Sequence, residues 1–254
     1  PPNLARLLSS IGSYAYTENE DTLFVHLYMG SILTKKIKDQ DVDVQIQSGF
    51  PWNGKLKITV RAKGTDFKLA LRVPGWCDSF TLQYDGQTLH GLTDKDVDAS
   101  VVDFKRIERK DGYLYISGVD QEEETITLDF PMEPQWIVAN PAVREDAGKV
   151  ALQRGPIVYC LEERDNGADL HLLSVDPTKQ PVPFNMKIQE EEVIALKAQG
   201  QRVIQDSSDP DGGQSALYAE YYVPEKESIE LVYVPYYTWA NRGENEMQVW
   251  TRTV

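Results

Sequence analysis

The sequence predicts an all-β protein of two antiparallel β-sandwich domains, preceded by one helix. Apolar and polar residues alternate over many short stretches, which is the period of a half-buried strand. Turn signals separate these stretches at intervals of roughly ten residues, as in β-sandwiches. The stretch from Lys149 to Glu162 is expected at the centre, because Gly155-Pro156 divides it into two apolar halves that fit no helical period. We therefore expect it to form a central pair of strands.

The first residues of the chain carry the one clear helical pattern. Asn3 is the expected N-cap of this helix and Gly12 its expected end. Because an apolar stripe needs a packing partner, we expect residues 1–14 to be the last helix of a helical domain that precedes this chain. The stripe would also allow two copies of the chain to form a homodimer. The apolar residues at helical spacing are Leu4, Leu7, Leu8 and Ile11.

The first sandwich is expected over residues 15–140. Its stretches alternate apolar and polar residues, and two turn signals, Pro51-Trp52-Asn53-Gly54 and Asp85-Gly86, predict hairpins. Nine stretches have the pattern of a strand: Leu23–Met29, Ile32–Thr34, Val42–Ile46, Leu56–Val60, Phe67–Val73, Phe80–Tyr84, Val101–Ile107, Tyr113–Ile116 and Thr125–Phe130.

The second sandwich is expected over residues 141–242. The final residues 243–254 could return to the first sandwich as an additional strand. A polar loop is expected over Asp165–Pro183, and Ile188–Ala198 fits either a strand or a short helix. Besides the central pair, the expected strands are Leu217–Val223, Ile229–Tyr237 and Met247–Trp250.

Composition and charge exclude several function classes. The 254 residues include 41% apolar residues, which are enough to build two cores. A formal net charge of −14 argues against nucleic acid as a partner, because no basic stripe is present to neutralise phosphates. It argues equally against docking to anionic membranes, and no apolar run reaches the roughly 20 residues of a membrane-spanning helix. A neutral substrate such as a sugar remains compatible with this acidity, and so does simple solubility.

The residues that commonly bind metals or act as nucleophiles form no recognisable motif. Cys77 and Cys160 lie in apolar surroundings, so buried free thiols are expected, although a disulfide between them stays open. The three histidines lie far apart, without a second ligand at metal-binding spacing. The acidic segment Asp206–Gln214 resembles a calcium loop only superficially, because it lacks the later glutamate of an EF-hand. We predict no metal and no cofactor in this chain.

Aromatic residues give the clearest indication of a binding function. Sugar rings stack on indole and phenol rings, and tryptophans in this chain lie at predicted turns and strand ends. The densest group is Tyr236-Tyr237-Thr238-Trp239. Packing of these rings in a sandwich core is the alternative interpretation. The candidate residues for stacking on a sugar are Trp52, Tyr236, Tyr237 and Trp239.

Several segments together resemble the C-terminal part of the bacterial β-L-arabinofuranosidase family of glycoside hydrolases, long known only as a domain of unknown function. The segments occur in the family's order and extend over the whole chain. They are PPNLARLLSSIGSYAY from Pro1, FPWNGKLKITV from Phe50, LRVPGWC from Leu71, GKVALQRGPIVYCLE from Gly148 and PYYTWANRGENEMQVW from Pro235.

This resemblance implies a parent protein with an N-terminal (α/α) barrel that holds the active site, followed by β-sandwiches. In the family a cysteine thiolate is the nucleophile and a glutamate the acid/base, beside a zinc ion bound by cysteines and that glutamate. The family's paired cysteines directly precede the Pro-Pro-Asn motif, which here is Pro1-Pro2-Asn3. Neither Cys77 nor Cys160 matches a catalytic position, so the resemblance implies no catalytic residue in this chain. It implies that Pro1, Pro2, Asn3 and Arg6 border the parent's site.

We therefore expect a non-catalytic part of a retaining, zinc-cysteine glycosidase that supports the missing N-terminal catalytic domain and is inactive alone. Zinc is expected in the parent's catalytic domain. The alternatives are a free-standing carbohydrate-binding module, with a carbohydrate as partner, and a structural sandwich. The family suggests a bacterial periplasmic or extracellular location.

Overall fold

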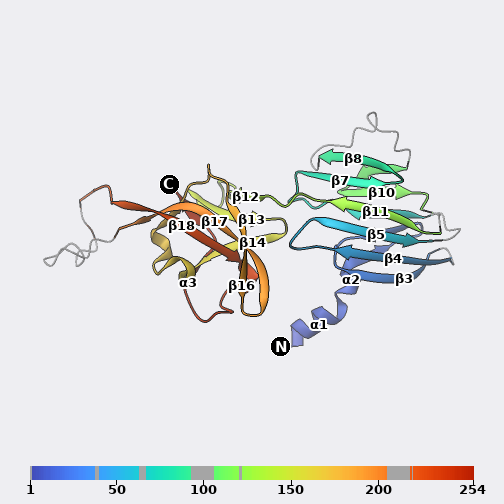
Figure 1. Cartoon of the computed structure of the whole chain (residues 1–254), viewed down its shortest axis with the longest axis horizontal. Coiled ribbons are helices and arrows are strands. Elements are labelled where there is room, and N and C mark those ends of the chain that lie inside the picture. Colours follow the sequence, from blue (N-terminus) through green and yellow to red (C-terminus); the bar gives the residue numbers. More distant parts are fainter. Residues whose placement is uncertain are drawn as a thin grey trace. The chain divides into compact units, whose positions relative to one another are not determined.

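The computed structural model describes residues 2–37, 40–62, 67–92, 106–119, 122–204, 218 and 220–254. Within these residues strands dominate, which confirms the predicted all-β fold of two sandwich-like domains (Figure 1). The chain divides into two compact units between Met132 and Glu133. The division precedes the predicted boundary after Asn140, because β12 (Pro134–Ile137) already pairs with a strand of the second unit. No helix in the described part of the chain is long and apolar enough to cross a membrane.

The predicted helix is present but differs at both ends. α1 spans Pro2–Ser10, so Asn3 lies inside the helix and is not its N-cap. Gly12 does not end the helical segment, because α2 (Gly12–Ala15) begins there and leads into the first strand. No residue of α1 is buried, and Leu4, Leu7 and Leu8 are 57%, 51% and 59% exposed. The apolar stripe of α1 therefore has no packing partner among the described residues.

The described residues of the first unit, residues 2–132, form two sheets that enclose one core. The five-stranded sheet has the order β1 (Tyr16–Glu18), β2 (Thr22–Val25), β6 (Lys68–Arg72), β10 (Tyr113–Ser117) and β9 (Ile107–Lys110). The six-stranded sheet has the order β3 (Ser31–Ile37), β4 (Gln40–Ser48), β5 (Lys55–Arg61), β11 (Glu124–Asp129), β7 (Ser79–Tyr84) and β8 (Gln87–Leu92). All pairs are antiparallel except β2 with β6, which run parallel.

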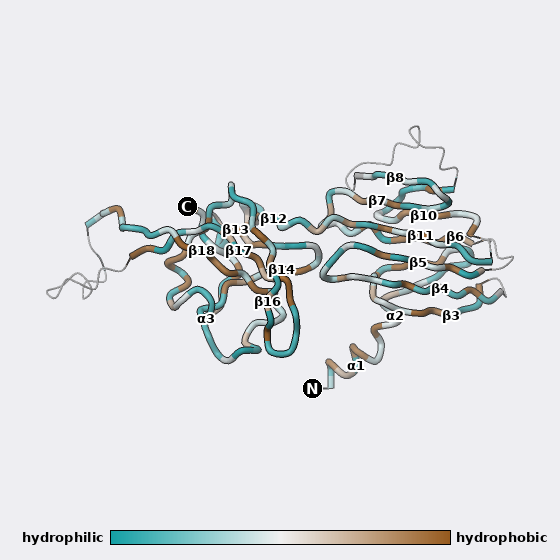
Figure 2. The backbone as a smooth tube through the Cα atoms, viewed as in Figure 1, coloured by the Kyte–Doolittle hydropathy of each residue, from teal (hydrophilic) through white to brown (hydrophobic). Residues whose placement is uncertain are grey.

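Alternation along these strands places one face of each sheet in the core. In β5 the residues Leu56, Ile58 and Val60 are buried, while polar neighbours between them face outward. Figure 2 shows the same alternation of hydrophobic and hydrophilic residues along β4 and β5. Burying an aliphatic side chain contributes about 1.5–3 kcal/mol, so this regular pattern fixes the register of the strands.

The two predicted hairpins differ in their turns. Asp85 and Gly86 both have positive φ angles of 49° and 71°, and they join Tyr84 to its partner Gln87, as a tight two-residue turn requires. The Asn-Gly signal is misleading, because β4 and β5 pair only from Ser48 and Leu56 onward and the connection between them is longer. Gly54 instead packs against the backbone of Phe130, where any side chain would collide with the carbonyl oxygen.

In the second unit, residues 133–254, the part that the structure describes forms one nine-stranded sheet. β13 (Lys149–Arg154) and β14 (Ile157–Glu162) form the predicted central hairpin, with Gly155 at a positive φ of 55°. Most of β14 is buried, as predicted. The other strands are β15 (Leu173–Val175), β16 (Val182–Ile188), β17 (Glu191–Val203), β18 (Lys226–Pro235), β19 (Met247–Gln248) and β20 (Thr251–Thr253).

Strand pairing closes this sheet on itself. β13 pairs with β20, β20 with β15, β15 with β17, β17 with β18, β18 with β14, and β14 with β13. The closed ring encloses the core, in which Tyr159 and Tyr233 are fully buried. Their hydroxyl groups donate to the Ile194 carbonyl and to Thr251, both at 2.9 Å, so no polar atom of either ring is left without a partner.

Several strand predictions are corrected by this topology. Residues 243–254 do not return to the first sandwich, because β19 and β20 pair with strands of the second unit. Ile188–Ala198 is largely strand β17, and the expected loop Asp165–Pro183 contains the whole of β15 and the start of β16. The described residues between 218 and 223 form no strand. Residues 101–105 and 206–214 lie outside the described part of the chain.

Candidate functional site

The segment 236–246 joins β18 to β19. It contains three exposed aromatic side chains and one largely buried arginine. We call it the aromatic loop. It begins with the short helix η3 (Tyr236–Thr238) and then turns sharply, with positive φ angles at Ala240 and Gly243. Its aromatic side chains face solvent, whereas its arginine is directed into the protein. Two acidic segments hold it: the end of β14 and the following helix α3 (Glu163–Asn166).

A buried carboxylate anchors the middle of the aromatic loop. The side chain of Glu162 is 0% exposed, although its residue type is among the least often buried. It accepts the Ala240 amide hydrogen at 3.0 Å and a hydrogen bond from the Arg242 guanidinium. Arg242 also donates to Asp165, with its Nη1 3.0 Å from Oδ1. One guanidinium is therefore shared by two carboxylates, an arrangement that we call the acid–arginine brace.

The brace is electrostatically strong because its charges are shielded from water. Only 12% of the Arg242 side chain and 13% of the Asp165 side chain are exposed. The hydrogen bond to Asp165 raises the pKa of Arg242, and Glu162 adds to this effect. Removing one partner of a buried ion pair typically costs about 3–5 kcal/mol, because the other charge is left without compensation.

Further hydrogen bonds hold the end of the loop. The Glu246 amide donates to the Glu163 carboxylate at 3.0 Å, and the Glu163 amide donates to the Glu246 carbonyl at 3.0 Å. The Glu246 carboxylate accepts the Leu170 amide hydrogen at 2.9 Å. The Gln189 side chain donates to the Asn241 carbonyl. The loop is thus connected to several parts of the unit, which gives a surface segment a defined conformation.

The aromatic side chains of this loop form a half-exposed patch. Tyr236, Tyr237 and Trp239 are 45%, 51% and 42% exposed. The rings of Tyr236 and Trp239 lie nearly parallel, with centroids 6.2 Å apart and planes inclined by 29°. Three of the four predicted stacking residues are therefore together, and they are not core residues. Trp52 belongs to the first unit and is half-buried.

The other predicted site residues lie in α1. Pro2, Asn3 and Arg6 are exposed along this helix, and Pro1 lies outside the described residues. The aromatic loop belongs to the other unit. The predicted role of these residues at the border of a parent site stays a prediction.

Neither cysteine has the surroundings of a nucleophile. Burial raises the pKa of Cys160 to about 12, and the nearby negative charge of Glu162 adds to the effect. Burial also raises the pKa of Cys77, whose thiol donates to the Ser79 carbonyl. Both are free thiols, as expected, and they belong to different units. In the described part of the chain, no three His, Cys, Asp or Glu residues form a group that could hold a metal.

Sequence reasoning missed the acid–arginine brace. Glu162 and Arg242 are 80 positions apart, so no local pattern connects them. One signal was available: Glu162 is the acidic end of the apolar run Ile157–Leu161, and a charge at the end of a buried strand needs a partner.

Two family models match this chain. One, described as the middle domain of the glycoside hydrolase family 127 β-L-arabinofuranosidases, matches residues 22–132. The other, the C-terminal domain of glycoside hydrolase family 127, matches residues 134–252. The two matches follow the division of the structure into two units at residues 132 and 133.

Individual proteins agree with the family models. The non-reducing end β-L-arabinofuranosidase of Bifidobacterium longum subsp. longum is 31% identical to this chain over an alignment of 260 residues. The alignment covers 99% of this chain and 36% of that protein. A crystal structure of a family 127 β-L-arabinofuranosidase from Geobacillus stearothermophilus has a TM-score of 0.85 and 38% identity, over 100% of this chain and 37% of that one. A second solved structure, described as a glycoside hydrolase, has a TM-score of 0.82 and 25% identity. The chain thus spans little more than a third of the length of these relatives.

Replacing Arg242 tests the brace. We expect Arg242→Met to lower the free energy of unfolding by about 3–5 kcal/mol, because Glu162 is then buried without a counter-charge. Urea denaturation followed by circular dichroism would measure the change. Glu190→Gln is the matched control, because it removes the exposed pair between Lys187 and Glu190 and should have little effect. A similar loss in both variants would contradict a special role for the brace.

Thiol labelling tests the burial of the cysteines. We expect neither Cys77 nor Cys160 to react with an aromatic disulfide reagent at pH 7 in the native chain, and both to react in denaturant, because burial disfavours both thiolates. The absorbance of the released thiolate gives the number of reactive cysteines. Rapid labelling of either native cysteine would show that a thiolate is accessible.

Proposed function

Because the chain belongs to glycoside hydrolase family 127 and contains its middle and C-terminal domains, we propose that it is the non-catalytic β-sandwich part of a glycoside hydrolase. In this proposal the two units support a catalytic barrel that precedes them in the parent protein. The parent hydrolyses β-L-arabinofuranosides with retention of configuration. This activity is proposed from the resemblance and from the names of the relatives.

One observation carries the supporting role: the unpartnered apolar face of α1. The side chains of Leu4, Leu7 and Leu8 are more than half exposed on one short helix. Figure 1 shows α1 leading away from the strands of the first unit. Covering these three side chains would contribute about 1 kcal/mol each, because roughly half of each is still exposed to water. A helical domain connected to this helix would supply the cover.

The residues of this chain do not fit the zinc site that the resemblance implies for the parent. Such a site needs several thiolates and a carboxylate in one place. Here each unit has one buried cysteine, and the described residues contain no metal-binding group. We therefore assign zinc and the catalytic residues to the parent's barrel and derive no catalytic step from this chain.

Recombining the parts tests the proposal. We expect this chain alone to show no zinc-dependent hydrolysis of an aryl β-L-arabinofuranoside, and to bind the separately expressed catalytic barrel of the Geobacillus stearothermophilus relative. The variant Leu4→Asp/Leu8→Asp should lose this binding, because it places two charges in the interface. Analytical ultracentrifugation would measure the complex, and the release of the aryl group would measure activity.

The matched control is Ile32→Asp, which places a charge on an exposed side chain of the first unit outside α1. It should leave the complex intact. Hydrolysis by the chain alone would contradict the non-catalytic role. A stable homodimer that depends on Leu4 and Leu8, without binding of the barrel, would show that α1 joins two copies of the chain instead.

A second candidate function, carbohydrate binding without catalysis, is favoured by the aromatic patch of Tyr236, Tyr237 and Trp239. Trp239 is exposed, whereas the other four tryptophans are half-buried. If a sugar stacks on the patch, arabino-oligosaccharides should change the tryptophan fluorescence of this chain, and Trp239→Ala should abolish the change. Val182→Ala, an exposed truncation elsewhere in the same unit, should not. An unchanged response in Trp239→Ala would place the sugar elsewhere.

A further inference from the structure

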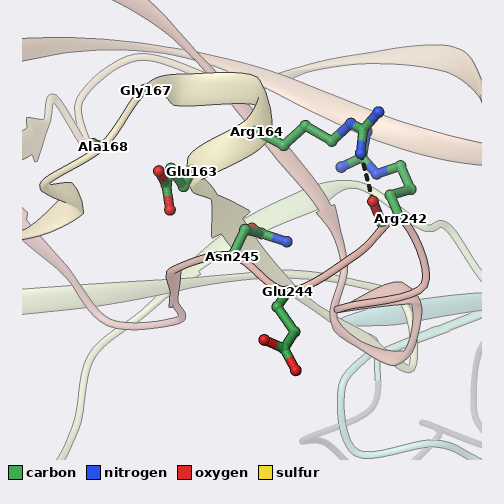
Figure 3. Close-up of a pocket in the computed structure, with 7 residues that line it drawn as sticks. All are labelled: Glu163, Arg164, Gly167, Ala168, Arg242, Glu244 and Asn245. Atoms are coloured by element: carbon green, nitrogen blue, oxygen red, sulfur yellow. Dashed lines mark hydrogen bonds between the residues drawn. The ribbon is translucent and has the colours of Figure 1, made fainter.

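A separate pocket lies on the inner side of the aromatic loop, between this loop and α3. Its volume is about 280 Å³. This volume is slightly below the roughly 300–1,000 Å³ of ligand pockets, so the pocket has room for one small molecule at most. None of the three aromatic side chains of the patch lines it. The lining residues are Glu163, Arg164, Gly167, Ala168, Arg242, Glu244 and Asn245 (Figure 3).

Two buried atoms of opposite polarity belong to residues that line this pocket. Nε of Arg242, a donor, and Oδ1 of Asn245, an acceptor, are both buried and have no hydrogen-bond partner. Buried polar atoms without partners are rare in folded proteins and costly. A group that accepts from one and donates to the other would satisfy both atoms. A hydroxyl group has both capacities.

The remaining side chains offer further hydrogen bonds of both kinds. Arg164 donates to the Arg242 carbonyl and carries additional N–H groups. Glu163 and Glu244 provide carboxylate acceptors. Figure 3 shows the guanidinium groups of Arg164 and Arg242 together at one end, with both carboxylates away from them. The pocket therefore suits a ligand with several hydroxyl groups better than one with a single polar atom.

The charges of the lining argue against an anionic ligand. The lining has two guanidinium groups and two carboxylates, so its formal charge is balanced. Arg242 is already paired with Glu162 and Asp165, which leaves it little attraction for an anion. The described residues contain no group of side chains that could hold a metal ion. Among the lining side chains only Ala168 is wholly apolar.

The structure assigns to this pocket a neutral, polyhydroxylated ligand of monosaccharide size. The Arg242 Nε–H donates to one hydroxyl oxygen of the ligand, and Asn245 Oδ1 accepts a hydroxyl hydrogen. This ligand class follows from the lining, so it depends neither on the supporting role proposed above nor on stacking at the aromatic patch.

L-Arabinose is a suitable probe, because it is neutral and carries hydroxyl groups around a single ring. We expect a titration followed by ¹H–¹⁵N NMR to shift the signals of the Arg242 Nε–H and of the Asn245 side-chain amide, with saturation. Trp239→Ala should leave the shifts unchanged, which separates the pocket from the aromatic patch. Asn245→Leu, which removes the proposed acceptor, should abolish the shift of the Arg242 Nε–H signal.

A modified ligand provides a test that does not depend on how a variant folds. Fully O-methylated arabinose can accept hydrogen bonds but cannot donate one to Asn245. We expect it to bind at least about tenfold more weakly than L-arabinose, which corresponds to about 1.4 kcal/mol. Equal binding of both sugars, stronger shifts with sodium sulfate, or no saturable shift with L-arabinose would each overturn the assignment. The last result would leave a pocket filled by water only.

Discussion

The conformation of the candidate site depends on the burial of one carboxylate. Glu162 follows the apolar residues of β14 and is removed from water, which would be costly without compensation. Arg242 supplies the opposite charge and the Ala240 amide supplies a further hydrogen bond. Both groups come from the aromatic loop. The loop is therefore held against β14, and the aromatic patch on its outer side and the polar pocket on its inner side both depend on this attachment.

Alternation of apolar residues made most of the fold predictable. It identified the sandwich strands and the central hairpin of β13 and β14, because the period is a local property. Pairing between distant strands was not predictable in the same way. β20 has only the three residues Thr251–Thr253, too few for a pattern, and its parallel pairing with β15 depends on the closed ring. The Asn-Gly turn signal at Asn53-Gly54 failed because packing of Gly54 against Phe130 determines that connection.

The site was predictable only where its residues are neighbours in sequence. Tyr236, Tyr237 and Trp239 formed a visible group, and all three are exposed as a binding surface requires. The acid–arginine brace joins residues far apart, in a chain with 40 acidic residues among which a single functional one is inconspicuous. The family resemblance implied a chemistry for the parent protein only. It gave no information on this loop, because none of the catalytic positions that it implies matches a residue of this chain.

Amide hydrogen exchange at Ala240 tests the central claim most directly. Its N–H is donated to the buried Glu162 carboxylate at 3.0 Å, whereas a loop amide in open solvent would exchange rapidly. We expect strong protection of the Ala240 amide in the native chain and its loss in Arg242→Met. Exchange at the rate of an unstructured peptide in the native chain would contradict the account, because the aromatic loop would then not be fixed by the brace.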